Sequence, residues 1–193
     1  MKKYIVILIV LLITLSIIVG LLINRTIERN SAEKQAQGIL DAIAQISVLD
    51  GDELKVAIEN TKMDGYQVIG TIKIDSVGIE YPILEKTTEE SLKLSVTKLS
   101  GPDLNTNGNV TIAGHNYSNG RVFSKLPNVK INDIIKITDM KGNTVQYKVY
   151  KTYTVDPTDI SCTYTTDPNK KEITLITCTL GAMRRIVVKA SEI

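Results

Sequence analysis

The chain has 193 residues, which is enough for one domain and an appendage. A net charge of only +2, with no Trp and a single Phe, argues against a nucleic-acid binder, because such proteins need a clustered basic surface or stacking aromatic rings. Two Cys are too few for a disulfide scaffold, and a single His without a CxxC or HExxH pattern argues against a zinc site.

The N-terminal segment is predicted to anchor the chain in a membrane. The run from Tyr4 to Ile23 is uncharged and almost wholly apolar, and it is long enough to span a bilayer. A cleaved signal peptide has a shorter apolar region and a small-x-small cleavage site, whereas here the run leads directly into Asn24 and Arg25. We therefore expect residues 1–24 to form an uncleaved, single-pass anchor.

The orientation of this anchor follows from the charges at its two ends. Lys2 and Lys3 favour a cytoplasmic N-terminus, although Arg25 and Arg29 on the far side partly offset that bias. The N-terminal tail is very short, and a large C-terminal domain can be translocated whatever its charge. We expect a short cytoplasmic N-terminus and an extracellular C-terminal domain.

Residues 25–65 are predicted to form a helical stalk or linker. Apolar residues recur there at three- and four-residue spacing, which is typical of one face of a helix. They are Ala32, Ala36, Ile39, Ile43 and Ile46. Asp50-Gly51-Asp52 indicates a turn, after which Asp52 is expected to cap a short helix through Ile58. The segment is either a plain spacer or a helix packed on the domain that shields its groove.

From Tyr66 onward the sequence changes to short β-branched and apolar runs separated by turns. Many short strands at regular spacing indicate a mainly β fold with a closed or nearly closed barrel. The predicted strands are Val68–Ile74, Ile79–Ile83, Asn109–Ala113, Ile134–Thr138, Thr144–Val155, Glu172–Thr177 and Arg185–Ala190.

Two local signals subdivide this region. Lys141-Gly142-Asn143 lies between alternating strands and predicts a hairpin. One short helix is expected from Thr87 to about Val96, because Thr87 and Glu90 have the spacing of a capping box.

A strand–turn–strand segment from Glu172 to Ala190 carries the first candidate site residues. Cys178 lies where the first strand ends and Arg185 where the second begins, with Gly181 in the break. If the strands pair, the thiol and the guanidinium lie at the same end of one sheet, where the positive charge stabilises the nucleophilic thiolate. The alternative is that Cys178 is a buried cysteine that packs as a small hydrophobe.

His115 is the third candidate, since acyl transfer also needs a proton donor for the leaving amine. It follows the strand Asn109–Ala113, although a lone His is more often structural than catalytic. Gly114 before it predicts a close backbone approach or an unusual backbone angle. Val122 and Phe123 are expected either to form one wall of a cleft beside His115 or to fill the core.

Together these segments resemble the sortases of Gram-positive bacteria, over about Gly70 to Ala190. The most specific part is Thr-Leu-x-Thr-Cys followed by Arg at a strand start. The matching runs are Gly70-Thr-Ile-Lys-Ile, Ile79-Glu-Tyr-Pro-Ile, Asn109-Val-Thr-Ile-Ala-Gly-His-Asn-Tyr, Val122-Phe-Ser-Lys-Leu, Thr174-Leu-Ile-Thr-Cys-Thr and Arg185-Ile-Val-Val-Lys.

The resemblance implies that residues 66–193 form a closed eight-stranded β-barrel with short helices and a groove for a sorting peptide of the Leu-Pro-x-Thr-Gly type. It implies that Cys178 attacks the Thr carbonyl and forms a thioacyl-enzyme. His115 would protonate the departing Gly amine and then deprotonate the incoming one. Arg185 would bind the developing oxyanion. Thr177 and Asn116 match motif positions and are expected to support the geometry.

The resemblance also bears on the choice between two arginines and on the subclass. Arg184 and Arg185 are neighbours and face opposite sides of a strand, and Arg-Ile-Val-Val-Lys matches the family when it begins at Arg185. The loop from Cys178 to Arg185 is shorter than in many members, and no lid motif lies between Asp50 and Gly70. Class D or class B is therefore favoured over the pilus-polymerising class C.

The leading hypothesis is a membrane-anchored cysteine transpeptidase that attaches surface proteins bearing a C-terminal sorting motif to a peptidoglycan precursor or cross-bridge amine. The alternatives are a cysteine peptidase that releases its product to water and a non-catalytic, anchored peptide-binding barrel. The chemistry needs no cofactor, and no dense carboxylate cluster predicts a calcium site. Cys162 is either an unpaired loop cysteine or a redox partner of Cys178.

Overall fold

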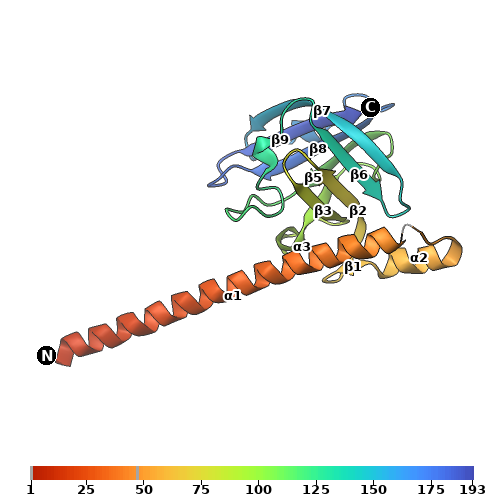
Figure 1. Ribbon diagram of the computed structural model, residues 1–193. Helices are drawn as coiled ribbons and strands as arrows, with labels where there is room; N and C mark the ends of the chain where they lie inside the picture. The colour runs from red at the N-terminus through yellow and green to blue at the C-terminus, as the bar shows by residue number, and fades with distance from the viewer. Residues whose placement is uncertain (1, 47) are drawn as a thin grey trace.

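A closed barrel of eight strands forms the body of the protein (Figure 1). The computed structural model describes residues 2–46 and 48–193. Around the barrel the order is β2-β3-β4-β5-β8-β9-β7-β6, and β6 pairs back onto β2 through Gly70 and Asp139. The short β1 adds to one end of β2. The predicted closed eight-stranded barrel is therefore confirmed.

The helices and strands have the following bounds. The strands are β1 (Lys62–Met63), β2 (Tyr66–Ile74), β3 (Ile79–Leu84), β4 (Val96–Ser100), β5 (Gly108–Ala113), β6 (Ile134–Asp139), β7 (Thr144–Val155), β8 (Lys171–Cys178) and β9 (Arg185–Glu192). The helices are α1 (Lys2–Ile46), α2 (Gly51–Asn60) and α3 (Glu89–Leu94), with 3₁₀ turns η1 (Leu126–Asn128) and η2 (Ser161–Thr163).

Both faces of β8 are buried from Glu172 to Thr177, which explains why apolar residues occur on both of them. Leu175 is fully buried in the main core that also holds Ile112 and Val188. Ile176 faces the other way and packs in a second buried cluster with Cys162. Strands buried on both faces carry near-continuous apolar runs. This double burial fixes the register of β8 and with it the position of Cys178 at its end.

The structure corrects the prediction between residues 87 and 100. The helix α3 begins at Glu89 and is capped by Thr88, which forms a capping box with Ser91, so Thr87 and Glu90 do not have the predicted roles. A strand that the sequence did not predict, β4, begins at Val96. Val96 is fully buried and pairs in parallel with β3, and this pairing outweighs the weak helical pattern.

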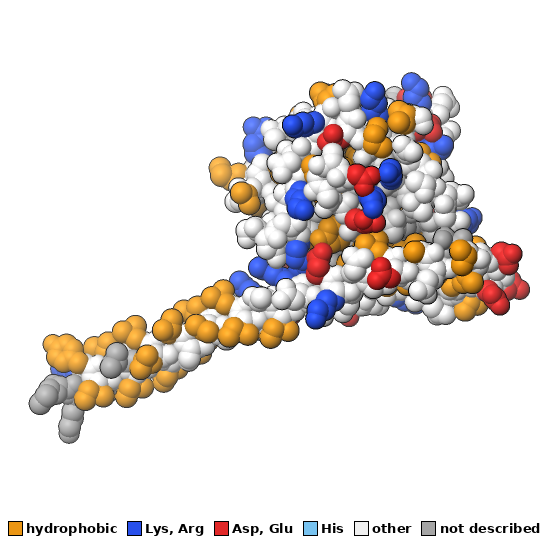
Figure 2. Space-filling view, viewed as in Figure 1, with side chains coloured by type: hydrophobic (Ala, Val, Ile, Leu, Met, Phe, Trp, Pro, Cys, Tyr) orange, Lys and Arg blue, Asp and Glu red, His pale blue; other side chains and the backbone are white. Residues whose placement is uncertain are grey.

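The N-terminal half of α1 projects beyond the barrel and carries apolar side chains along its length (Figure 2). The helix from Lys3 to Ile46 contains an 18-residue window of mean hydropathy 3.4, none of which is buried. It is long and apolar enough to cross a membrane, by length and composition. The same helix continues without a break past Asn24, so the predicted division at residue 24 stays a prediction.

The C-terminal half of α1 packs against the barrel (Figure 1). Ala32, Ala36, Ile43 and Ile46 are all buried, as their spacing on one helical face predicted. The interpretation of this segment as a plain spacer is therefore wrong, because the helix is packed on the domain. In α2, Asp50 is the residue before the helix and Asp52 lies in its first turn, so Asp52 is not the cap.

Candidate active site

Cys178 and Arg185 meet at one end of the β8–β9 ladder. They are paired residues in the antiparallel register, as are Ile176 and Val187 two positions further in. Directly opposed residues on antiparallel strands project from the same face. Cys178 is exposed and Arg185 is half-buried, so the thiol is open to solvent with a guanidinium as its cross-strand neighbour.

His115 reaches the same edge from the other side of β8. β5 and β8 are parallel, and the last pair of their ladder joins Ala113 and Ile176. Gly114 continues the ladder, because its N–H donates to the carbonyl oxygen of Ile176 at 3.1 Å. Two residues beyond each member of the last pair lie His115 and Cys178. The register therefore places these two residues at the same level of adjacent strands.

Two side-chain hydrogen bonds tie the ends of β5 and β8 together. The buried Thr177 hydroxyl donates to the carbonyl oxygen of Gly114 at 2.7 Å. The Asn116 amide donates to the carbonyl oxygen of Cys178 at 2.8 Å. Each bond joins a residue next to one candidate catalytic side chain to the strand that carries the other. This arrangement agrees with the supporting role expected for Thr177 and Asn116.

The turn that follows His115 is tightly packed. A Cβ added to Gly114 would lie 2.8 Å from Cδ2 of Phe123, so the predicted close approach is confirmed. Phe123 and Val122 are almost completely buried in the core, which decides between their two predicted roles in favour of core filling. The Phe123 N–H donates to the carbonyl oxygen of His115 at 3.0 Å, which closes the turn.

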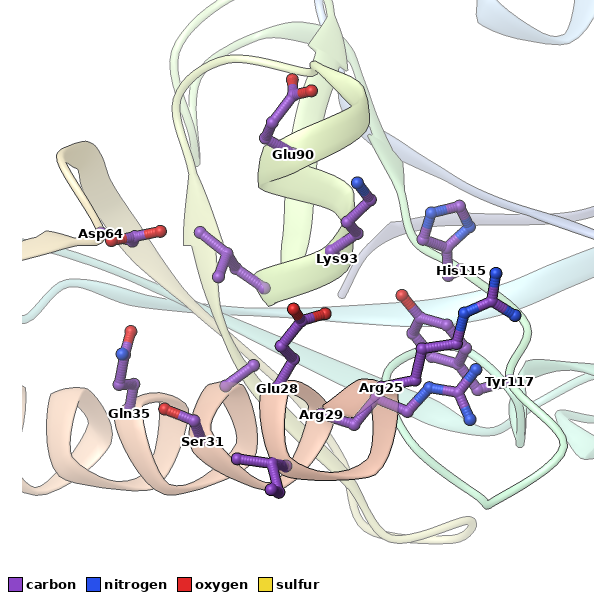
Figure 3. A pocket seen from close by; sticks show the side chains of 13 residues that line it. Arg25, Glu28, Arg29, Ser31, Gln35, Asp64, Glu90, Lys93, His115 and Tyr117 are labelled. Carbon is purple, nitrogen blue, oxygen red and sulfur yellow. The ribbon is translucent and has the colours of Figure 1, made fainter. Parts of the chain in front are cut away.

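A cavity of about 840 Å³ opens beside His115, between α1 and α3. Figure 3 shows the charged ends of Arg25 and Arg29 from α1, and of Lys93 from α3, on the side of the cavity nearest to His115. Tyr117 lies below the His115 ring, with ring centroids 5.1 Å apart. The N-terminal helix therefore supplies one wall of the space next to the candidate general acid.

The surroundings of His115 favour its neutral form. Burial lowers the pKa of the imidazole, and the positive charge of Lys93 lowers it further. A group with a depressed pKa is a stronger acid once it is protonated, and it is mostly available as a base at neutral pH. Such an imidazole can give a proton to a poor leaving group and accept one from an incoming amine.

The structure separates the two neighbouring arginines. Arg184 lies in the exposed loop after β8, where its guanidinium donates to the carbonyl oxygen of Thr154 at 3.4 Å. Arg185 is the first residue of β9 and is half-buried opposite Cys178. The loop between the strands is closed by the Thr179 N–H, which donates to the carbonyl oxygen of Arg184 at 2.8 Å. Only Arg185 of the two pairs with Cys178.

Both thiols are free. Cys162 is 2% exposed and lies in the second buried cluster, where burial raises the pKa of its thiol. Cys178 is exposed. The structure thus favours an unpaired Cys162 over a redox pair. Within residues 2–46 and 48–193, no group of three or more His, Cys, Asp or Glu side chains is arranged to hold a metal ion.

Comparison with known proteins identifies the family. The Sortase domain model matches residues 72–193. The chain belongs to the sortase family. It is 33% identical to sortase A of Bacillus anthracis over 153 residues, which cover 79% of this chain and 69% of the relative. It is 31% identical to sortase A of Listeria monocytogenes over 112 residues, which cover 58% of this chain and 49% of the relative.

Solved sortase structures have the same fold. A Clostridium perfringens sortase D5 transpeptidase superposes with a TM-score of 0.67 at 26% identity, over 83% of this chain and 97% of the other. The Listeria monocytogenes sortase A superposes with a TM-score of 0.60 at 28% identity, over 65% of this chain and 87% of the other. This sortase is therefore a cysteine transpeptidase that acts on surface proteins, and the non-catalytic alternative is set aside. The subclass stays a prediction.

Sequence reasoning missed residues beside His115 and in the contact between α1 and the turn after β5. Tyr117 and Lys93 line the cavity beside His115, and Arg121 forms an ion pair with Glu33 of α1. No local pattern marks them, because they come from α1, α3 and the loop after β5 and meet only in the folded chain. The amphipathic spacing of α1 predicted that one face is buried, but not which strand ends it covers.

Proposed function

We propose that this sortase cleaves a Leu-Pro-x-Thr-Gly-like sorting signal after Thr and transfers the acyl group to a cell-wall amine. The partners are surface proteins with a C-terminal sorting motif and an amine of a peptidoglycan precursor or cross-bridge. The proposal assigns Cys178 as nucleophile, His115 as general acid and base, and Arg185 as oxyanion donor. The support for this assignment is the strand register, which brings the three residues to one edge of the sheet.

In the first half-reaction, the Cys178 thiolate attacks the carbonyl carbon of Thr in the bound signal. Negative charge develops on the carbonyl oxygen, where the Arg185 guanidinium donates hydrogen bonds and supplies a fixed positive charge. Protonated His115 gives its proton to the Gly nitrogen as the C–N bond breaks. The products are a thioacyl-enzyme and a peptide with a free amine.

In the second half-reaction, the acceptor amine attacks the thioester carbonyl. Neutral His115 takes the proton from the attacking nitrogen, and Arg185 again stabilises the oxyanion. The C–S bond breaks, the thiolate of Cys178 leaves and a new amide bond remains. If water attacks in place of the amine, the product is a free acid, as the peptidase alternative requires.

We further propose that α1 anchors the enzyme in the membrane with the barrel outside the cell. The support is the apolar surface of the helix between Tyr4 and Ile23, whose described side chains are exposed. A surface of this kind is stable in lipid and unfavourable in water. In this arrangement the barrel and the unprocessed surface protein are held at the same membrane face.

The proposal is tested with the full chain in detergent micelles. The protein is incubated with a panel of Leu-Pro-x-Thr-Gly-like peptides, with and without hydroxylamine or a short glycine peptide, and the products are read by mass spectrometry. We expect cleavage after Thr and an amine-linked product, both absent in Cys178→Ala. Free acid as the only product would support the peptidase. Uncut peptides across a panel that varies every motif position would overturn the proposed substrate class.

A further inference from the structure

A carboxylate from the membrane-proximal helix reaches the turn that carries His115. Oε2 of Glu33 accepts a hydrogen bond from Nε of Arg121 at 2.7 Å, although 88 residues separate the two. Glu33 also accepts from the hydroxyl of Tyr81 at 2.9 and 3.1 Å. Burial raises the pKa of Tyr81 to about 12, so this hydroxyl keeps its proton and stays a donor near neutral pH.

Arg121 depends on Glu33 for its neutralisation. Its side chain is only 7% exposed, whereas that of Glu33 is 47% exposed. In the described part of the chain, Nη1 and Nη2 of Arg121 are buried and have no hydrogen-bond partner, and Glu33 is its one salt-bridge partner. Removing one member of such a pair leaves an uncompensated buried charge, which is strongly unfavourable. The buried Arg121 therefore helps to fix the position of α1, and Glu33 of α1 compensates the charge of Arg121.

The Tyr117 ring connects this ion pair to His115. The Arg121 guanidinium carbon lies 5.7 Å from the centroid of the Tyr117 ring, within the range of a cation–π contact. Arg29 of α1 lies 5.5 Å from the same centroid. The ring in turn lies against His115 with a tilted geometry of 55°. Figure 3 shows His115, Tyr117 and Arg29 together at this side of the cavity.

The backbone next to Arg121 is strained and needs support. Val122 has φ of +54°, a conformation that is a genuine outlier for a β-branched residue. It forms an isolated β-bridge with Asn116, the neighbour of His115. Strained residues persist only where the surrounding structure holds them in place. The ion pair of the adjacent Arg121 is one such contact, so its loss is transmitted through a short, closed turn to His115.

We propose that Glu33 and Arg121 are positioning residues that fix the orientation of His115, so that the membrane-proximal helix is a working part of the active site. The inference rests on the proposed role of His115 in the reaction. The helix contributes through the Glu33–Arg121 pair and the Tyr117 ring, without contact between Glu33 and the reacting atoms. Removing the Glu33 charge leaves the buried Arg121 guanidinium without its salt-bridge partner and removes one support of the turn.

The test compares Glu33→Gln with Glu33→Asp in the full chain. Glu33→Gln keeps an acceptor for Tyr81 but removes the charge, and Glu33→Asp keeps the charge. The matched control is Asp41→Asn, which removes an exposed carboxylate from the same helix, where its contact is with Gln37. A double variant of Glu33→Gln with Arg121→Gln tests whether the effects of the two residues are coupled.

Two measurements distinguish a change in the position of His115 from a general loss of folded protein. His115 is the single histidine of the chain, so its imidazole signals in NMR need no assignment and give its pKa directly. The second readout is the division of any loss of peptide cleavage between kcat and KM. The charged groups that line the cavity beside His115 are the same in all variants, namely Arg25, Glu28, Arg29, Asp64, Glu90 and Lys93.

We expect Glu33→Gln to lower kcat about tenfold with little change in KM, as displacement of a catalytic group does. We expect it also to change the His115 pKa, because the turn that carries the imidazole shifts relative to Lys93 and the buried surroundings, with Glu33→Asp close to wild type and the double variant no worse than the single one. Glu33→Gln that matches Asp41→Asn in both readouts would overturn the inference. A His115→Ala variant with wild-type turnover would refute the proposed role of His115 instead, while the NMR titration would still report the coupling.

Discussion

Cys178 and Arg185 face each other as the final pair of the β8–β9 ladder, so the thiol and the guanidinium leave the sheet from the same edge and the same face. A two-strand pairing fixes this relationship more rigidly than a loop would. The nucleophile and the oxyanion donor proposed here are thus placed by backbone hydrogen bonds, and only the third group, His115, depends on a turn.

This pairing predicts different effects for the two adjacent arginines. Arg185→Met is expected to lower kcat by about 10²–10³-fold, because it removes a donor to the developing oxyanion. Arg184→Met is the matched control and is expected to stay close to wild type, since the Arg184 guanidinium lies in an exposed loop and donates to the carbonyl of Thr154. Steady-state cleavage of the best peptide measures both. An equal loss in the two variants would show that the assignment to Arg185 is incorrect.

Lys93 is predicted to set part of the acidity of His115. Burial and the charge of Lys93 both lower the pKa of this imidazole, so Lys93→Met is expected to raise it towards its ordinary value of 6.5. The measurement is the NMR titration of the single histidine. Lys86→Met, which removes an exposed charge before α3, is the control and is expected to leave the titration unchanged.

The same pKa shift has a consequence for stability with a defined sign. Because the folded pKa of His115 lies below the unfolded value, unfolding takes up a proton when the pH lies between the two. The contribution of His115 is fully present above pH 6.5 and is lost as the pH falls through the folded pKa. Urea unfolding of wild type and His115→Gln should therefore diverge in pH dependence below 6.5 and run parallel above it.

Thr177 is predicted to support both stability and catalysis. Thr177→Val keeps the shape of the side chain but leaves the Gly114 carbonyl without its hydroxyl donor, at a cost of about 1–3 kcal/mol. Since this bond joins the ends of β5 and β8, kcat is expected to fall as well. Thr177→Ser restores the donor and should recover most of both losses. Urea unfolding measures the loss of stability, and peptide cleavage measures the loss of kcat.

The two cysteines are predicted to differ in reactivity. Maleimide should label Cys178 within the folded protein and leave Cys162 unmodified, because Cys162 is buried and its thiol pKa is raised. Tryptic mass spectrometry locates the label. Cys162→Ala is expected to keep its activity under oxidising conditions to the same extent as wild type. An oxidised wild-type protein with linked Cys162 and Cys178 peptides would contradict this prediction.

Much of this site could be predicted because its key relationships are local in sequence. Cys178 and Arg185 belong to one strand–turn–strand unit, so β alternation and a short loop were enough to bring them together. His115 required one more step, its position at the end of another strand, and the family resemblance supplied the pairing. Seven of the barrel strands were visible as β-branched runs, whereas β4 is short and its beginning was absorbed into a predicted helix.

The contacts of α1 could not be predicted, since they are tertiary. The spacing of Ala32, Ala36 and Ile43 predicted that one face of the helix is buried. Such spacing does not identify the part of the protein that packs against this face. Glu33 lies among charged residues on the same helix, and nothing in the sequence distinguishes it from its neighbours. Its partner Arg121 is buried only because the turn after β5 folds beneath α1.

Because α1 is one continuous helix, it fixes the distance between the proposed membrane span and the residues near His115. The proposed membrane span ends at Ile23, and Arg29, which lies against Tyr117, is six residues further along an unbroken helix. At a rise of 1.5 Å per residue, this is about 9 Å of axial distance. With α1 anchored as proposed, a rigid rod of this length would set how far the scissile bond of a substrate must stand from the lipid surface. The length of spacer between a sorting motif and its own membrane segment would then become a selection criterion, separate from the motif itself.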